Sequence, residues 1–131
     1  MSMTYEDFLT KVIDDGIAEA RKSYAKPEQA HKLEGSIAGF QACRGKSPSA
    51  IRALLEKANE EAWVEMDVAV DEGAKDDGPA LERYWCLRCK ALEIEWVANV
   101  VSAGLSTVNQ PGIVPVTARG YMKAADILGV A

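Results

Sequence analysis

The chain has 131 residues, of which 48% are hydrophobic and 27% charged, and its formal net charge is −5. A chain of this length fits one domain that buries roughly two thirds of its unfolded surface, so it needs neither a metal nor a disulfide to fold. The acidic balance excludes general binding to nucleic acid or to anionic lipid, because phosphate groups require a basic face.

The three cysteines are an odd number in a chain that is not small, which indicates reduced thiols in a cytosolic protein. The N-terminal stretch is acidic and amphipathic, unlike a signal peptide. No apolar run approaches the roughly 20 residues of a membrane span. We therefore expect a cytoplasmic protein with no membrane contact.

Apolar residues recur with a helical period through the first three quarters of the chain. Pro27 and the pair Ser47–Pro48 are start signals, because proline suits the first turn of a helix and serine caps it. Gly45 is a stop signal, since glycine adopts the left-handed conformation that ends many helices. These signals predict helices over residues 5–25, 27–44, 48–74 and 79–104.

Gly35 and Gly39 lie one turn apart inside the second predicted helix. Glycine in a helix interior costs up to about 1 kcal/mol relative to alanine. We predict that the backbone of another helix comes close at these two positions.

The helix predicted over residues 79–104 carries two apolar stripes on nearly opposite faces, because successive residues are rotated by about 100°. One stripe consists of Trp85, Cys89, Leu92, Trp96, Val100 and Ala103, and the other of Leu87, Ala91, Ile94, Ala98, Val101 and Leu105. A helix with two apolar faces is central or has a partner on each side. Either the last helix or a second copy would cover the second face. We expect a homo-oligomer, formed through this face or through the C-terminal arm, with interface residues Leu87, Ile94, Val101 and Leu105.

The composition changes after Gly104, where prolines and β-branched residues predict an extended arm over residues 105–117. A short fifth helix is predicted over residues 118–128. Short connections between the first four helices favour antiparallel neighbours. The predicted fold is a single all-α domain over residues 1–131, an antiparallel four-helix bundle with an extended C-terminal arm and a short fifth helix.

Two patterns resemble metal-ligand sets, and both are interpreted as structural. Cys86 and Cys89 form a C-x2-C, but they lie mid-helix, and the other candidates, Cys43 and His31, lie about 18 Å apart along a continuous helix. Glu28 and His31 form one E-x-x-H, whereas a di-iron bundle uses two such pairs. The single histidine also removes most hydrolase schemes with a histidine base. We predict no metal site and no cofactor.

Acidic residues gather on the third predicted helix, and the candidates for a protein-binding face are Glu60, Glu61, Glu65, Asp67 and Asp71. Such a face would meet a basic partner surface. An alternative use is to hold magnesium in an all-helical nucleotide hydrolase, which pairs E-E-x-x-E with E-x-x-D. The spacing here is one residue longer, and the next helix offers Glu93-x-Glu95, which places the two side chains on different faces.

A small-ligand pocket is a second candidate site, and it would be lined by Tyr84, Trp85, Arg88 and Trp96. The structural interpretation of the same residues is that Arg88 pairs with a carboxylate, since buried charges need partners. Trp63, Trp85 and Trp96 then belong to the core.

Residues 28–48 (EQAHKLEGSIAGFQACRGKSP) and 81–105 (LERYWCLRCKALEIEWVANVVSAGL) resemble segments of small uncharacterised all-helical proteins of bacteriophage or prophage origin. The resemblance carries over no functional residue. It implies a phage-encoded protein that acts by binding, for example by blocking a host defence or nucleic-acid-handling complex.

No complete catalytic constellation is present in the sequence. We therefore expect a non-enzymatic protein that acts by protein–protein interaction on another protein. The alternatives are a small-ligand or nucleotide-binding helical oligomer and a metal-dependent all-α nucleotide hydrolase.

Overall fold

The computed structural model describes residues 5–71, 79–106, 113–116 and 120–123, with side chains over 5–71 and 81–102. Helices make up most of this part of the chain, which confirms the predicted all-α framework. The elements in chain order are α1 (Tyr5–Ser23), the 3-10 helix η1 (Pro27–Gln29), α2 (Ala30–Cys43), α3 (Pro48–Asp71), α4 (Pro79–Ser106), β1 (Ile113–Val116) and β2 (Gly120–Lys123).

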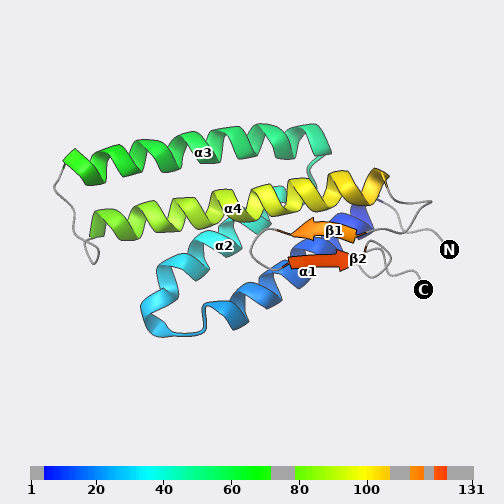
Figure 1. Ribbon diagram of the computed structural model, residues 1–131, viewed down its shortest axis with the longest axis horizontal. Coiled ribbons are helices and arrows are strands. Elements are labelled where there is room, and N and C mark those ends of the chain that lie inside the picture. The colour runs from blue at the N-terminus through cyan, green and yellow to red at the C-terminus, as the bar shows by residue number, and fades with distance from the viewer. Residues whose placement is uncertain (1–4, 72–78, 107–112, 117–119, 124–131) are drawn as a thin grey trace.

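Helix α4 lies at the centre of the arrangement (Figure 1). Helix α3 runs antiparallel along one side of α4 and contacts little else. Helix α2 packs on another side of α4, and α1 packs mainly on α2 and more weakly on α4. The side of α3 that faces away from α4 is therefore left uncovered by the other described elements.

The predicted start and stop signals between α2 and α3 are confirmed. The Ser47 hydroxyl accepts a hydrogen bond from the backbone N–H of Ala50 at 3.2 Å, and α3 begins at Pro48. Gly45 has a φ of 72°, the left-handed conformation that favours glycine. The chain therefore turns sharply here, because serine, proline and glycine satisfy the local backbone requirements.

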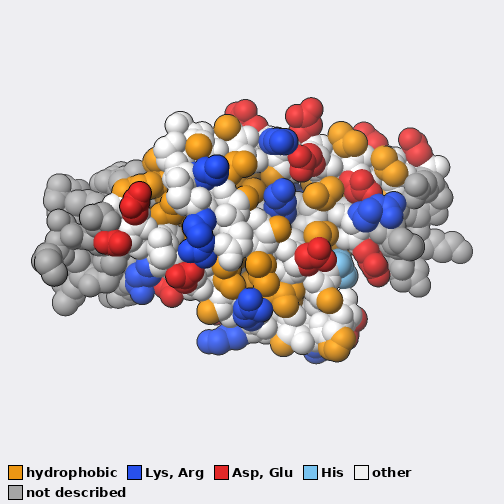
Figure 2. Space-filling view, turned by 180° about the vertical axis from the view of Figure 1, so that it is seen from behind, with side chains coloured by type: hydrophobic (Ala, Val, Ile, Leu, Met, Phe, Trp, Pro, Cys, Tyr) orange, Lys and Arg blue, Asp and Glu red, His pale blue; other side chains and the backbone are white. Residues whose placement is uncertain are grey.

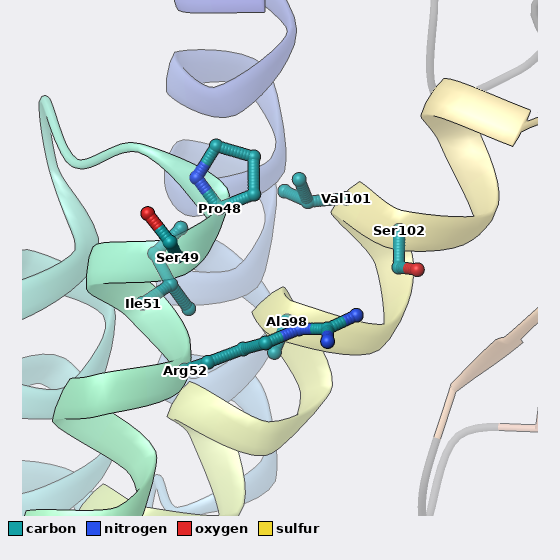
Figure 3. A pocket seen from close by; sticks show the side chains of 7 residues that line it. All are labelled: Pro48, Ser49, Ile51, Arg52, Ala98, Val101 and Ser102. Atoms are coloured by element: carbon teal, nitrogen blue, oxygen red, sulfur yellow. The ribbon is translucent and has the colours of Figure 1, made fainter.

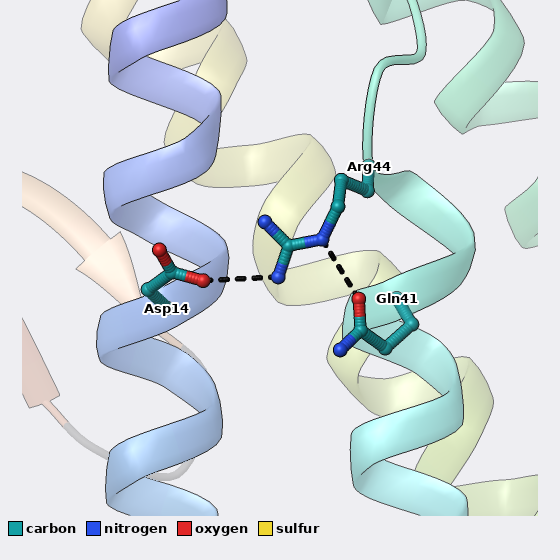
Figure 4. A network of polar contacts seen from close by, with 3 residues as sticks. All are labelled: Asp14, Gln41 and Arg44. Atoms are coloured by element: carbon teal, nitrogen blue, oxygen red, sulfur yellow. Dashed lines mark hydrogen bonds and ion pairs between the residues drawn. The ribbon is translucent and has the colours of Figure 1, made fainter.

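Polar contacts tie α1 to this turn. The Arg44 guanidinium donates to the Asp14 carboxylate at 2.9 Å and to the Gln41 side-chain oxygen at 2.7 Å (Figure 4). The Tyr5 hydroxyl donates to the backbone carbonyl of Lys46 at 2.7 Å. These contacts are exposed, so they orient α1 and contribute little to stability.

The predicted close approach at the glycines of α2 is confirmed, and the neighbour is α4. A Cβ atom placed on Gly35 would collide with the carbonyl group of Cys86. A Cβ atom placed on Gly39 would lie 2.5 Å from the carbonyl oxygen of Lys90. The backbones of α2 and α4 therefore pack against each other without side chains between them.

Both apolar stripes of α4 are largely buried over their described side chains, as a central helix requires; the exception is Trp85, predicted to lie in the core, which is 40% exposed. On one side, Trp96 is 2% exposed and packs edge-on against Phe40 of α2, with ring centroids 5.7 Å apart. On the other side, Ala98 and Val101 lie against Ile51 at the start of α3. The second face is thus covered by α3, and neither the last helix nor a second copy is needed to bury it.

This burial corrects the predicted oligomer interface. Ile94 and Val101 are 0% and 1% exposed within a single chain, so a second copy cannot reach them. Leu87 is only partly accessible, and the side chain of Leu105 lies outside the described residues. The prediction was wrong for Ile94 and Val101 because packing within the single chain already buries both side chains.

The C-terminal prediction is also corrected. Helix α4 continues to Ser106, and β1 agrees with the extended arm. Residues 120–123, predicted as helix, form β2, which pairs antiparallel with β1 in a register that joins Val116 to Gly120. An isolated short helix is marginal in water, whereas an extended neighbour offers backbone hydrogen bonds. Residues 124–128 of the predicted helix lie outside the described residues.

We expect Gly35→Ala to lower the free energy of unfolding by about 1–3 kcal/mol, the usual cost of overpacking. Helix propensity alone would raise it by about 1 kcal/mol, so the two effects differ in sign. Urea denaturation measures the difference. Ala38→Gln, at an exposed position of the same helix, is the control and should change little. A Gly35→Ala variant as stable as the wild type would contradict the close approach.

Candidate functional site

Helix α3 leaves several large apolar side chains of its C-terminal half in solvent. Near its N-terminus Ile51 is buried and Leu54 and Leu55 pack against the core. Further along, the fully buried residues are Ala58, Ala62 and Ala69. Trp63, Val64 and Val70 are 64%, 57% and 68% exposed. The alanines let α3 lie close to α4, and the larger residues therefore remain on the solvent side.

These side chains belong to one continuous surface, which we call the outer face of α3. Its members recur at intervals of three and four residues, the spacing that places residues on one side of a helix. The outer face consists of Glu60, Trp63, Val64, Asp67, Val70 and Asp71, all of them exposed. Hydrophobic and acidic side chains alternate along the edge formed by α3 in Figure 2.

The structure divides the five acids predicted to form one binding face. Glu60, Asp67 and Asp71 lie on the outer face, and none makes an ion pair with another described residue. Glu65 instead lies at the side of α3, where it accepts a hydrogen bond from the Arg83 guanidinium at 2.7 Å. Glu61 is half-buried. The predicted acidic face is thus reduced to three carboxylates.

The exposure of Trp63 corrects its assignment to the core. The signal was present in the sequence, because Trp63, Val64 and Val70 fall outside the stripe of Ile51 and the alanines that recurs with a helical period. Because the helical period assigns other residues of this helix to the buried stripe, Trp63 has to lie outside that stripe on the helix surface.

The ligand pocket predicted from four residues of α4 is not assembled. Tyr84 and Trp85 contact each other edge-on at 5.2 Å, and the Lys32 ammonium lies 5.1 Å from the centre of the Trp85 ring. Arg88 donates to the side-chain oxygen of Asn59 on α3 at 3.4 Å, an amide partner in place of the predicted carboxylate. Trp96 is buried against α2. The four side chains point to different neighbours and cannot line one pocket.

One cavity, of about 540 Å³, lies between the start of α3 and the last turns of α4 (Figure 3). Its apolar lining includes Ile51, Ala98 and Val101, and the Arg52 side chain extends across it toward Ser102. Arg52 is exposed and takes part in no ion pair among the residues described. The cavity offers an apolar floor, a single cation and the hydroxyl groups of Ser49 and Ser102.

A second cavity, of about 530 Å³, lies where α2, α3 and α4 meet, and its lining residues are His31, Glu34, Glu65, Glu82, Arg83, Cys86 and Leu87. The sequence could not predict this convergence, because the residues come from three helices. Over the described residues, no group of three histidine, cysteine or acidic side chains has a geometry that could hold a metal ion.

The cysteines are free thiols in unreactive surroundings. Burial raises the pKa of Cys43 to about 12. Burial, with a smaller contribution from Glu34, also raises the pKa of Cys86, and burial raises that of Cys89 against the opposing effect of a hydrogen bond with Tyr24. Raised pKa values keep the thiols protonated at neutral pH, so they are weak nucleophiles and weak metal ligands.

The acids required for the hydrolase alternative do not converge either. Glu93 is 7% exposed and lies on the α2 side of α4, where its Cβ atom would be 3.2 Å from a Cβ atom on Gly39. Asp67 and Asp71 project from the opposite side of the neighbouring helix α3, into solvent. A magnesium site shared between α3 and α4 would need these groups on facing surfaces.

Comparison with protein-family models, with curated proteins and with solved structures found no match. Within the described part of the chain, no helix has both the length and the apolarity needed to cross a membrane. The candidate site is therefore assigned from its geometry alone, and the outer face of α3 is the surface that combines exposed apolar area with charge.

Because the pKa of Cys43 is raised in the folded chain, the free energy of unfolding should fall at alkaline pH. The folded chain holds this thiol neutral up to about pH 12, whereas a thiol in the unfolded chain ionises near pH 8.5. The stabilisation is therefore complete below the unfolded pKa and is lost as the pH rises toward 12. By pH 10.5, about two pH units above the unfolded pKa, the loss should be roughly 3 kcal/mol.

Urea denaturation of the wild type and of Cys43→Ala at pH 7.5 and pH 10.5 checks this expectation. Other groups that titrate in this range contribute equally to both proteins. The free energy of unfolding should fall more in the wild type than in the variant. Equal falls would show that Cys43 ionises normally in the folded state.

Proposed function

We propose that this protein is a non-enzymatic binding protein that acts by contact with another protein, and that the outer face of α3 is its contact surface. The observation that carries the proposal is the exposure of Trp63, Val64 and Val70 on a helix that the other described elements cover from one side only. Contiguous exposed apolar side chains on a folded protein mark interaction sites.

Trp63 is the residue around which the contact would form. A tryptophan buries about 200 Å² in an interface, and 64% of Trp63 is still accessible. Covering that remainder would contribute about 3 kcal/mol at 25 cal/mol per Å². Association itself costs at least about 4 kcal/mol, so the neighbouring valines and charges have to contribute as well. Tryptophan anchors surrounded by smaller contacts are typical of interface hot spots.

The positions of the polar groups support a binding role over an enzymatic one. The single histidine lines the second cavity together with Glu34, Glu65 and Glu82, but among the described residues it forms no ion pair with any of them. Acid–base or nucleophilic catalysis requires such groups within hydrogen-bond reach of one another. The resemblance to small helical phage proteins favours the same proposal, since such proteins often act by binding.

Site-specific photo-cross-linking tests the proposal. A benzophenone amino acid at position 64, which is 57% exposed in the wild type, should cross-link to a different protein in cells that naturally produce the chain. The same amino acid at position 19, exposed on α1, is the control and should give no such product.

Adding Trp63→Ser to the position-64 protein should abolish the cross-link, with the helical circular dichroism signal unchanged. The proposal would be wrong if positions 64 and 19 gave the same products, or if the product persisted without Trp63. Because Trp63 is largely exposed, its loss should change the free energy of unfolding by less than about 0.5 kcal/mol.

A further inference from the structure

The outer face of α3 has an internal repeat of charge and apolarity. Glu60 and Asp67 are seven residues apart, and so are Trp63 and Val70. Seven residues are almost two helical turns, so each pair lies along one line parallel to the helix axis. The face therefore presents a line of carboxylates beside a line of apolar side chains. A partner that fits both lines must carry the complementary pattern with the same period.

A second copy of the chain does not fit this pattern. A two-fold axis could bring the Trp63 and Val70 side chains of two copies together in a parallel pairing, or in an antiparallel pairing with Trp63 of one copy opposite Val70 of the other. Either pairing would also bring Asp67 close to Asp67 of the second copy. Like charges held together at an interface cost several kcal/mol. The apolar residues and the carboxylates are too closely interleaved for self-association to bury one group and avoid the other.

A shifted antiparallel pairing does not remove the conflict. The exposed bases of α3 are Arg52 and Lys57, both nearer its N-terminus. Placing Lys57 opposite Asp67 of a second copy would place Trp63 opposite Glu61. The charges would then be matched, but the apolar residues would not meet. The face therefore selects a partner other than itself.

We propose that the partner is a basic amphipathic helix, with lysine or arginine and large apolar residues repeating at the heptad spacing, which packs along the outer face of α3. This inference rests on the proposed function and specifies the partner's chemistry. Each base would pair with one of the three carboxylates, which have no ion-pair partner among the described residues, and each apolar residue would pack beside Trp63 or Val70 as in a coiled-coil seam.

The dimensions of the face support a helical partner. From Glu60 to Asp71 the helix rises about 16 Å, or three turns. A partner helix of about three to four turns would span this length, the usual extent of an amphipathic helix that docks on a protein surface. Nucleic acids and anionic lipids are excluded as occupants, because their phosphates would meet three carboxylates.

Fluorescence anisotropy with a synthetic peptide tests the inference. The probe is a labelled 21-residue peptide with lysine at the first and leucine at the fourth position of each heptad and alanine and glutamine elsewhere. One control has the same composition in scrambled order, and a second has glutamate in place of every lysine. The patterned basic peptide should bind at least about tenfold more tightly than either control, a difference of about 1.4 kcal/mol.

Variants of the protein locate the binding. Asp67→Lys and Trp63→Ser should each weaken binding of the patterned peptide about tenfold, as expected for a charge pair and a hot-spot anchor. Glu19→Lys on α1 is the matched charge control, and Trp85→Ser, at a residue 40% exposed on α4, is the matched tryptophan control. Neither control should change the affinity by more than about twofold.

Equal affinity for the patterned and scrambled peptides would overturn the inference, and so would binding that Asp67→Lys leaves unchanged. Neither result affects the cross-link expected at position 64, so the inference can fail while the proposed function stands. A cross-link from position 64 to a second copy of the chain would also contradict the inference, since it would show that the copies do tolerate the facing carboxylates.

Discussion

The close contact between the backbones of α2 and α4 is the constraint on which the rest of the structure depends. Side chains larger than glycine at positions 35 and 39 would meet the carbonyl groups of Cys86 and Lys90. This contact brings Phe40 edge-on to Trp96 and fixes which side of α4 faces α2. The remaining apolar stripe of α4 then has one helix left to cover it, which is α3.

In the C-terminal half of α3 the residues buried against the rest of the fold are alanines, Ala58, Ala62 and Ala69, and the larger side chains there lie on the solvent side. Alanine side chains permit a short distance between helix axes, but they fill little volume. Two large residues of the helix, Trp63 and Val70, therefore contribute almost nothing to the core. An exposed tryptophan lowers solubility and adds little to stability. Its presence on the surface is therefore typical of a binding site.

The carboxylates on the outer face of α3 limit the kinds of surface that could bind there. Apolar residues alone would bind any complementary apolar face, including that of a second copy, whereas interleaved carboxylates oppose every acidic partner. In the complex that we propose, specificity and avoidance of self-association would thus come from the same three side chains. These carboxylates have no ion-pair partner among the described residues, in contrast to Glu65, which pairs with Arg83.

Much of the helical framework could be predicted from local signals. Ser47, Pro48 and Gly45 set the turn between α2 and α3, because capping and left-handed backbone preferences act over a few residues. The two faces of α4 and the need for a close neighbour at Gly35 were also readable, since helical period and glycine cost are properties of one segment.

Which neighbour meets which face was decided only by the tertiary structure. Ile94 and Val101 have the sequence pattern of an interface, but they are buried within the single chain. Trp63 is a large apolar residue of the kind found in cores, but α4 packs against other residues of α3 and leaves Trp63 exposed. The strand at residues 120–123 likewise depends on pairing with β1. A sequence determines where apolar surface lies on each helix, whereas the partner that buries it depends on competition among segments distant along the chain.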